Sequence, residues 1–218
     1  MSGNNQIKGL IFDCYGTLID IKTDENSPYT YDAVSKWLQY HGVKIGPDTL
    51  KENYFRKVKA KMAQSDEKCP EIKIEEIFAD ICSENSIWDI NTIELGIETS
   101  KVFRSASLRK LEIFQESVAV LVKHFYMPKC IVSNGQRVFS EQELRFLGLY
   151  DHFDFIVFSS DLGYKKPDHR LFKYAMERLG LEPHQLLSLG DTLENDIIPP
   201  QELGMRSMHI KEAWEFMS

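Results

Sequence analysis

The chain has 218 residues, with 26 Lys and Arg against 33 Asp and Glu, and a formal net charge of −7 at pH 7. This length fits one domain of roughly 200 residues, or a core of about 130 residues that carries a smaller insert. Hydrophobic residues make up 43%, which argues against disorder, and the acidic balance gives no electrostatic footprint for nucleic acid.

The sequence gives no sign of a membrane segment or a disulfide framework. No apolar run approaches the roughly 20 residues that a membrane-spanning helix needs. The opening residues, MSGNNQIKGLIFDCYG, reach polar and turn residues too early for the apolar region of a secretory signal. Scattered cysteines without a CxxC pair favour reduced thiols. They are Cys14, Cys69, Cys82 and Cys130. We therefore expect a cytoplasmic protein without membrane or nucleic-acid partners; the sequence does not indicate an oligomeric state.

Short apolar segments, each followed by a polar turn, recur along the chain. They are residues 9–12, 129–132, 155–158 and 186–189, with 205–210 as a fifth candidate. Helical stretches at 116–124, 140–147 and 169–179 lie between them. Strands that alternate with helices of this length predict βαβ units and a doubly wound parallel α/β sheet.

Residues 19–111 break this alternation. Their apolar residues recur at helical spacing, as in Val34, Trp37 and Leu38, or Leu50, Tyr54 and Val58. Pro47 is placed like a first-turn proline and Gly42 like a helix terminator. We predict three or four helices and no strand here. The predicted organisation is an α/β core, residues 1–18 and 112–218, with an inserted helical cap, residues 19–111.

Polar residues follow three of the predicted strands. Parallel α/β sheets bind ligands at the carboxyl ends of their strands. Convergence at that edge would bring together Asp13, Thr17, Ser133, Asn134 and Asp191, with Asp196 one short loop further on. Three carboxylates in one crevice repel one another, and desolvation increases the cost. Such a cluster needs a cation, either a metal, a lysine or both.

Both kinds of cation have candidates. Hard oxygen ligands without a nearby Cys or paired His favour Mg²⁺. The segment GYKKPD, residues 163–168, supplies the lysine. A lysine directly before proline sits in extended backbone at the start of a helix, so Lys166 is preferred, with Lys165 as the alternative.

The segments FDCYGTL, IVSNG, KKPD and GDTLEND, in this order, resemble the four motifs of the haloacid dehalogenase (HAD) superfamily. The resemblance covers the first 18 residues and nearly everything after about residue 112, and the helical insert resembles the C1-type cap of that superfamily. It implies that Asp13 is a nucleophile whose covalent aspartyl intermediate is hydrolysed by water. It also implies that Thr17 and Ser133 hold the transferring group, and that Lys166 neutralises Asp13 and the substrate.

The same resemblance implies a set of metal ligands. They are Asp13, the backbone carbonyl of Tyr15 and Asp191, with Asp196 as an outer or alternative ligand. The position of Tyr15 is usually Asp in the phosphatases of the superfamily, where it protonates the leaving oxygen. Tyrosine at this position is similar to the 2-haloacid dehalogenases, whose halide leaving group needs no proton.

Two features separate phosphatase from dehalogenase. The dehalogenases work without metal, whereas a further carboxylate at Asp191, beside Asp13, makes sense only with a bound cation. On the dehalogenase side, Arg56 is the candidate for their cap arginine, which would make it a substrate ligand; the alternative is a solvated helix residue. We assign Asn134 and Tyr15 to the substrate pocket as well, with simple packing as the equal alternative for the Tyr15 side chain.

We therefore expect a hydrolase, foremost a Mg²⁺-dependent phosphatase of a small, anionic, phosphorylated metabolite. Without Asp at position 15, it should favour a good leaving group such as an acyl phosphate, or take the proton from water or from the substrate. The first alternative is a metal-independent 2-haloacid dehalogenase. The second is a non-catalytic family member that binds a phosphorylated ligand or a partner. The substrate itself depends on cap residues and is not indicated by the sequence.

Overall fold

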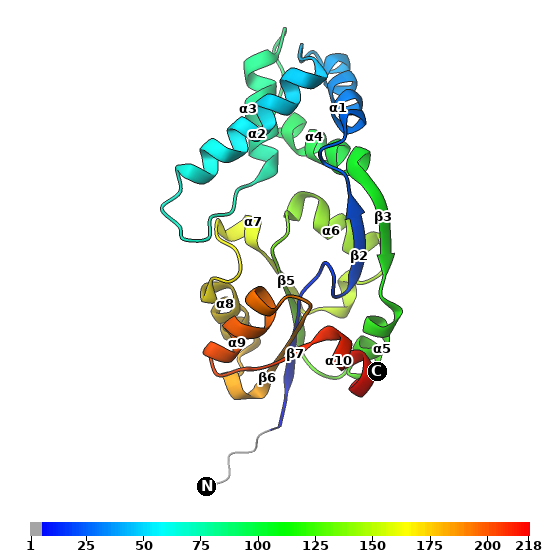
Figure 1. Ribbon diagram of the computed structural model, residues 1–218, viewed down its shortest axis with the longest axis vertical. Coiled ribbons are helices and arrows are strands. Elements are labelled where there is room, and N and C mark those ends of the chain that lie inside the picture. The colour runs from blue at the N-terminus through cyan, green and yellow to red at the C-terminus, as the bar shows by residue number, and fades with distance from the viewer. Residues whose placement is uncertain (1–5) are drawn as a thin grey trace.

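A five-stranded parallel sheet forms the centre of the larger half of the molecule (Figure 1). The computed structural model describes residues 6–218, so the first five residues of the predicted core segment 1–18 lie outside the described range. The strands are β1 (Gly9–Phe12), β4 (Lys129–Ser133), β5 (Phe155–Phe158), β6 (Leu186–Gly190) and β7 (Arg206–His209). Their order, β5-β4-β1-β6-β7, with every pair parallel, confirms the predicted α/β fold.

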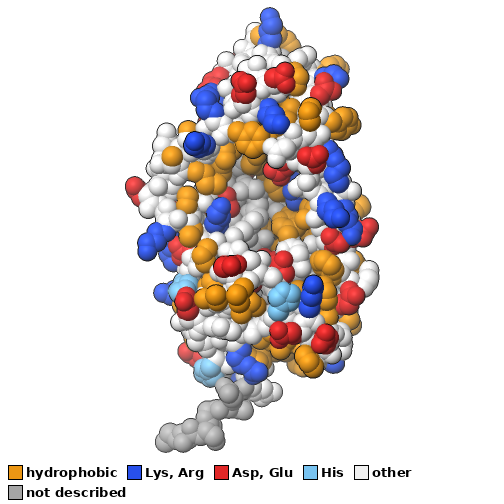
Figure 2. All heavy atoms as spheres, viewed as in Figure 1, with side chains coloured by type: hydrophobic (Ala, Val, Ile, Leu, Met, Phe, Trp, Pro, Cys, Tyr) orange, Lys and Arg blue, Asp and Glu red, His pale blue; other side chains and the backbone are white. Residues whose placement is uncertain are grey.

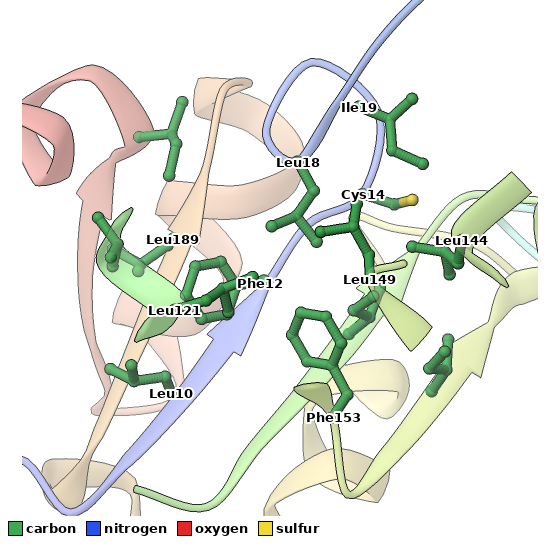
Figure 3. Close-up of a cluster of buried hydrophobic side chains, with 14 of the residues drawn as sticks. Leu10, Phe12, Cys14, Leu18, Ile19, Leu121, Leu144, Leu149, Phe153 and Leu189 are labelled. Carbon is green, nitrogen blue, oxygen red and sulfur yellow. The ribbon is translucent and has the colours of Figure 1, made fainter. Parts of the chain in front are cut away.

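Helices cover both faces of this sheet, which explains why its central strands are buried and mostly apolar. Every residue of β1, β4 and β6 is buried. Alternate residues face opposite sides: Leu10 and Phe12 belong to one apolar cluster, drawn in Figure 3, and Ile11 to the other. The core helices are α5 (Gln115–Lys123), α6 (Arg137–Phe146), α7 (Ser159–Leu162), α8 (His169–Leu179), α9 (Ile198–Glu202) and α10 (Ile210–Phe216). Short 3₁₀ turns span Tyr150–His152 and Pro183–Gln185, and a π-helical turn spans Leu193–Ile197.

Four helices form a second body above the sheet, which we call the cap (Figure 1). They are α1 (Pro28–Tyr40), α2 (Pro47–Ala63), α3 (Ile74–Asn85) and α4 (Thr92–Ser107). Proline occupies the first turn of α1 and of α2, and Gly42, with φ +83°, follows the end of α1. Tyr31, Tyr54, Phe78 and Phe103 fill the cap's own core. None of the described helices combines the length and apolar composition that crossing a membrane requires.

The prediction that residues 19–111 contain no strand is wrong. β2 (Ile19–Thr23) and β3 (Leu108–Ile113) pair antiparallel and form the two connections between the core and the cap (Figure 1). Most of their residues are half-buried or exposed, so neither strand shows a clear apolar pattern. Each strand is stabilised by pairing with the other, for example Ile19 with Ile113, and such a distant partner leaves no local signal in the sequence.

Candidate active site

The predicted polar residues gather at the carboxyl edge of the sheet. Asp13 directly follows β1 and Asp191 directly follows β6, while Asp196 lies in the π-helical turn after β6. One carboxylate oxygen from each of these three residues lies within 4.8 Å of the other two. They come together because β1 and β6 are neighbours and run in the same direction. Figure 2 shows that the molecule is hollowed between the cap and the core.

Lys166 is the buried cation of this cluster. Its Nζ donates to Asp13 Oδ1 at 2.6 Å, to Asp196 Oδ1 at 2.6 Å and to the carbonyl oxygen of Val132 at 2.9 Å. The residue is only 3% exposed, so its three donors are satisfied without solvent. The structure therefore selects Lys166 over Lys165 as the lysine that contacts the carboxylates.

Burial and charge act against each other in this ion cluster. Burial raises the pKa of Asp13 to about 6, although the ammonium group of Lys166 opposes the shift. Burial also disfavours the charged form of Lys166, but Asp13 and Asp196 outweigh it and raise the lysine pKa above its ordinary value. Near neutral pH the lysine is therefore charged and Asp13 is largely ionised.

Two glycines allow the backbone to approach the carboxylates. Gly16 has φ +84°, and a Cβ atom at this residue would overlap the carboxylate of Asp191. A Cβ atom at Gly190 would overlap the Cβ and carboxylate of Asp196. Any side chain at Gly16 or Gly190 would displace one of the three acidic groups.

Asn134 has a positional role that sequence analysis did not predict. Its Oδ1 accepts from the backbone N–H of Lys166 at 2.7 Å, and its Nδ2 donates to the carbonyl oxygen of Lys166 at 3.2 Å. The amide is thus occupied by the backbone of the lysine rather than turned to a substrate. Of the two hydroxyl residues, Ser133 is buried at the end of β4, and Thr17 Oγ1 is buried with no hydrogen-bond partner among residues 6–218.

The Tyr15 side chain belongs to a buried polar network between the core and the cap. Its hydroxyl donates to the Glu143 carboxylate and is also hydrogen-bonded to Ser140 Oγ at 2.7 Å. Arg104, from α4 of the cap, donates through Nε to Glu143 Oε1 at 2.6 Å and lies 5.5 Å from the Tyr15 ring centre. Burial and nearby acidic groups, Glu143 among them, raise the pKa of Tyr15 well above its ordinary value, so the hydroxyl stays protonated.

Arg104 and Glu143 were missed by sequence analysis, and Arg56 does not join the cluster. Arg56 is exposed on α2 and donates to Asn53 Oδ1 at 2.9 Å; no contact in the described residues connects it with Asp13. The one available signal for Glu143 is its place on the buried face of α6, next to Leu144. An acidic residue on the buried face of a helix indicates that the fold supplies a partner for its charge, but the sequence does not identify that partner.

The acidic cluster fits a divalent metal ion. One lysine cannot balance three clustered carboxylates, and the charge left over matches that of Mg²⁺. The donors are hard oxygens, and Asp191 is exposed, so an ion held there would keep the water ligands that Mg²⁺ prefers. The residues that would hold the ion are Asp13, Asp191 and Asp196, and the carbonyl of Tyr15 stays a predicted further ligand.

Comparison with known proteins places this site in a family. The family model described as haloacid dehalogenase-like hydrolase matches residues 7–204. Among curated relatives, the glyceraldehyde 3-phosphate phosphatase of Methanocaldococcus jannaschii is 32% identical over 125 residues, which are 56% of this chain and 54% of that protein. The pyrimidine 5'-nucleotidase YjjG of Escherichia coli is 38% identical over 69 residues, 31% of each chain. The chain thus spans about half, or less, of the curated relatives that it matches.

Solved structures share the fold. A 2-haloacid dehalogenase from Pseudomonas syringae superposes with a TM-score of 0.63 at 23% identity, covering 93% of this chain and 85% of the other. A HAD phosphatase from Thermococcus onnurineus superposes with a TM-score of 0.56 at 22% identity, covering 92% and 85%. Both kinds of enzyme therefore use this architecture, and the fold does not choose between them.

Proposed function

The chain belongs to the haloacid dehalogenase-like hydrolases, and from this premise we propose that it is a Mg²⁺-dependent phosphatase of a small phosphorylated metabolite. The observation that carries the proposal is the acidic cluster, in which Asp191 adds a third carboxylate beside Asp13 and Asp196. A site that displaces halide has no need of this extra negative charge. The partial matches to curated phosphatases support the same choice.

Asp13 is the proposed nucleophile. Its Oδ1 is held by Lys166, so the other carboxylate oxygen, Oδ2, is the one that attacks phosphorus. The new Oδ2–P bond forms as the bond from phosphorus to the leaving oxygen breaks, and water then hydrolyses the aspartyl phosphate to release inorganic phosphate. Thr17 and Ser133 are the proposed hydrogen-bond donors to the transferring group. Mg²⁺, when bound, would supply charge neutralisation to the phosphoryl oxygens.

The leaving group receives no proton from residue 15 in this proposal. The Tyr15 hydroxyl is engaged with Ser140 and Glu143, and its raised pKa reflects a stable protonated state within that network. The substrate should therefore carry a good leaving group, such as an acyl phosphate, or supply the proton through water or a group of its own. Rates across phosphate esters should fall as the pKa of the leaving group rises, and a flat dependence would contradict this proposal.

The first experiment is hydrolysis of p-nitrophenyl phosphate and acetyl phosphate, with Mg²⁺ and with EDTA. Asp13→Asn removes the nucleophile, and Asp151→Asn, at an exposed position in the core, is the matched control. Turnover that needs both Mg²⁺ and Asp13, and that survives in the control, supports the phosphatase proposal. Turnover that persists in EDTA or in Asp13→Asn refutes it.

A metal-independent 2-haloacid dehalogenase is the second candidate, and Tyr15 is the observation that favours it. The same Asp13 oxygen would attack carbon and expel halide, a leaving group that needs no proton. Chloride release from 2-chloropropionate in EDTA, without phosphatase activity, would establish this alternative. Mg²⁺ binding without turnover of either substrate class would instead favour a ligand-binding or partner-binding protein.

A further inference from the structure

A segment of the cap lies directly against the active-site loops. The connection from α2 to α3 reaches down to the neighbourhood of α7 (Figure 1), and its last part, with the first residue of α3, is residues 69–74. The backbone N–H of Lys165 donates to the carbonyl oxygen of Cys69 at 2.9 Å, and that of Glu71 donates to the carbonyl oxygen of Gly163 at 3.0 Å. Pro70 and Tyr164 form an isolated antiparallel bridge between these two bonds. The cap thus pairs with the loop that carries Lys166.

Glu71 is the central polar side chain of this contact. Its Oε2 accepts from Ser159 Oγ at 2.8 Å, and its Oε1 accepts from Gln136 Nε2 at 3.1 Å. Gln136 completes the junction, because its Nε2 also donates to the carbonyl oxygen of Ile72 at 2.9 Å and its Oε1 accepts from the backbone N–H of Ile74 at 3.0 Å. One carboxylate therefore links the loop after β4 to the segment after β5.

Both linked loops determine where Lys166 lies. The loop after β4 contains Asn134, whose amide binds the backbone of Lys166 on both sides. The segment after β5 begins with Ser159 and continues to Lys165, whose backbone binds the cap. The lysine is therefore fixed from two directions, through Asn134 on the core side and through residues 69–71 on the cap side. Its Nζ has little freedom, since three acceptors surround it.

We propose that Glu71 is a positioning residue, through which the docked cap holds the two loops that aim Lys166 at Asp13. The expected effect of Glu71 on turnover rests on the proposed function. Its effect on the position of the loops around Lys166 does not depend on the reaction. Glu71 acts as a hydrogen-bond acceptor and transfers no proton. A displacement of about 1 Å at a reacting group can cost on the order of 100-fold in rate, so loosening these loops should be visible in kcat.

The test compares Glu71→Ala with Glu71→Gln. Alanine removes the acceptors of Ser159 and Gln136. Glutamine restores both bonds without charge, because its amide oxygen accepts from Gln136 and its amide N–H donates to the serine hydroxyl. With p-nitrophenyl phosphate and Mg²⁺, Glu71→Ala should lose about 10- to 100-fold in kcat with KM changed by less than about threefold. Glu71→Gln should stay within about threefold of the unmodified protein in kcat.

Glu67→Ala is the matched control. Glu67 lies shortly before this segment and pairs with Arg170 of the core, with side chains 35% and 46% exposed, and among the described residues neither side chain bonds to the loop after β4. The Glu67→Ala variant should keep kcat within about twofold of the native value, because an ion pair in contact with solvent contributes little to holding the loops in place. If Glu71→Ala does not fold, Ser159→Ala removes one of the same hydrogen bonds from the core side.

Hydrogen–deuterium exchange of residues 163–166 gives a readout that needs no substrate. The amides of Lys165 and Lys166, bound to Cys69 and Asn134, should exchange at least tenfold faster in Glu71→Ala and at the native rate in Glu71→Gln and Glu67→Ala. If the native protein has no phosphatase activity but its Lys165 and Lys166 amides exchange slowly, and faster in Glu71→Ala, the phosphatase proposal is refuted and the positioning role is not. Equal impairment of the alanine and glutamine variants, or unchanged exchange and kcat in Glu71→Ala, would overturn the positioning role.

Discussion

The ion pair between Arg104 of the cap and Glu143 of the core predicts a large loss of stability when one partner is removed. Their side chains are 11% and 7% exposed, and the Nε–Oε1 distance is 2.6 Å. Burial disfavours the charged guanidinium, but its hydrogen bonds to Glu143 more than offset this and raise the pKa of Arg104. Replacing Glu143 with Ala would leave that charge buried, with Glu25, at 3.8 Å, as its remaining ion-pair partner among the described residues.

The magnitude follows from the burial. Breaking a buried pair from one side costs about 3–5 kcal/mol of unfolding free energy, because the remaining charge is uncompensated. For a domain of this size each kcal/mol lowers Tm by about 2–4 °C, so Glu143→Ala should lower Tm by about 6–20 °C. Glu141→Ala, on the same helix, is the control. Its carboxylate is 26% exposed and pairs with Arg137 and Arg145 on the surface, at about 0–1 kcal/mol for each pair.

Urea unfolding followed by circular dichroism measures both losses. A double variant, Arg104→Met with Glu143→Leu, should recover most of the stability, since it removes both charges and keeps apolar volume. A loss in Glu143→Ala no larger than that in Glu141→Ala would refute the argument from burial. A double variant as unstable as Glu143→Ala would show that shape, rather than the uncompensated charge, is responsible.

Three further predictions concern the metal site and the thiols. Because burial raises the pKa of Asp13 to about 6, protons should compete with Mg²⁺ below that pH, and calorimetric titration should show affinity falling about tenfold per pH unit there but level above it. Gly16→Ala should destabilise the fold by about 1–2 kcal/mol, since φ is +84°, and should weaken Mg²⁺ binding about 10-fold or more by displacing Asp191; unchanged affinity would contradict the predicted ligand. In native protein at pH 8, Ellman's reagent should modify the half-buried Cys69 alone, and two or more fast thiols would contradict this. The other three thiols, of Cys14, Cys82 and Cys130, are buried, and burial raises their pKa values, that of Cys82 to about 11.

The central strands and the acidic cluster were predictable because their signals are local. β1, β4 and β6 are buried at every position, and each contains a short apolar segment that is visible in the sequence, although β4 also includes Lys129 and β6 includes Ser188. A polar residue directly after such a segment is expected at the carboxyl edge of a parallel sheet, so Asp13 and Asp191 could be placed at the same edge from the sequence. That they meet there depends on β1 and β6 being neighbours, which the structure shows. The position of Lys166 directly before Pro167 then favours it over Lys165 as the lysine of the site.

The contacts between the cap and the core were not predictable in the same way. Arg104 and Glu143 are 39 residues apart, and Tyr15 and Glu143 are 128 residues apart, so no periodicity connects them. Arg56 illustrates the same limit: its position in a cap helix allowed either a substrate contact or a solvated side chain, and the structure shows it exposed on α2. Charge and helix location alone do not determine which face of a helix a residue occupies against another domain.

The sequence by itself determined the parallel sheet, the edge where the site lies and the residue types that gather there, because strand burial and strand direction are encoded in consecutive residues. Only the tertiary structure decided that β2 pairs with β3, that Asn134 holds the backbone of Lys166, and that Glu71 joins the cap to the active-site loops. Each of these contacts depends on a partner far along the chain, and the sequence around a polar group does not identify the distant group with which it forms a hydrogen bond.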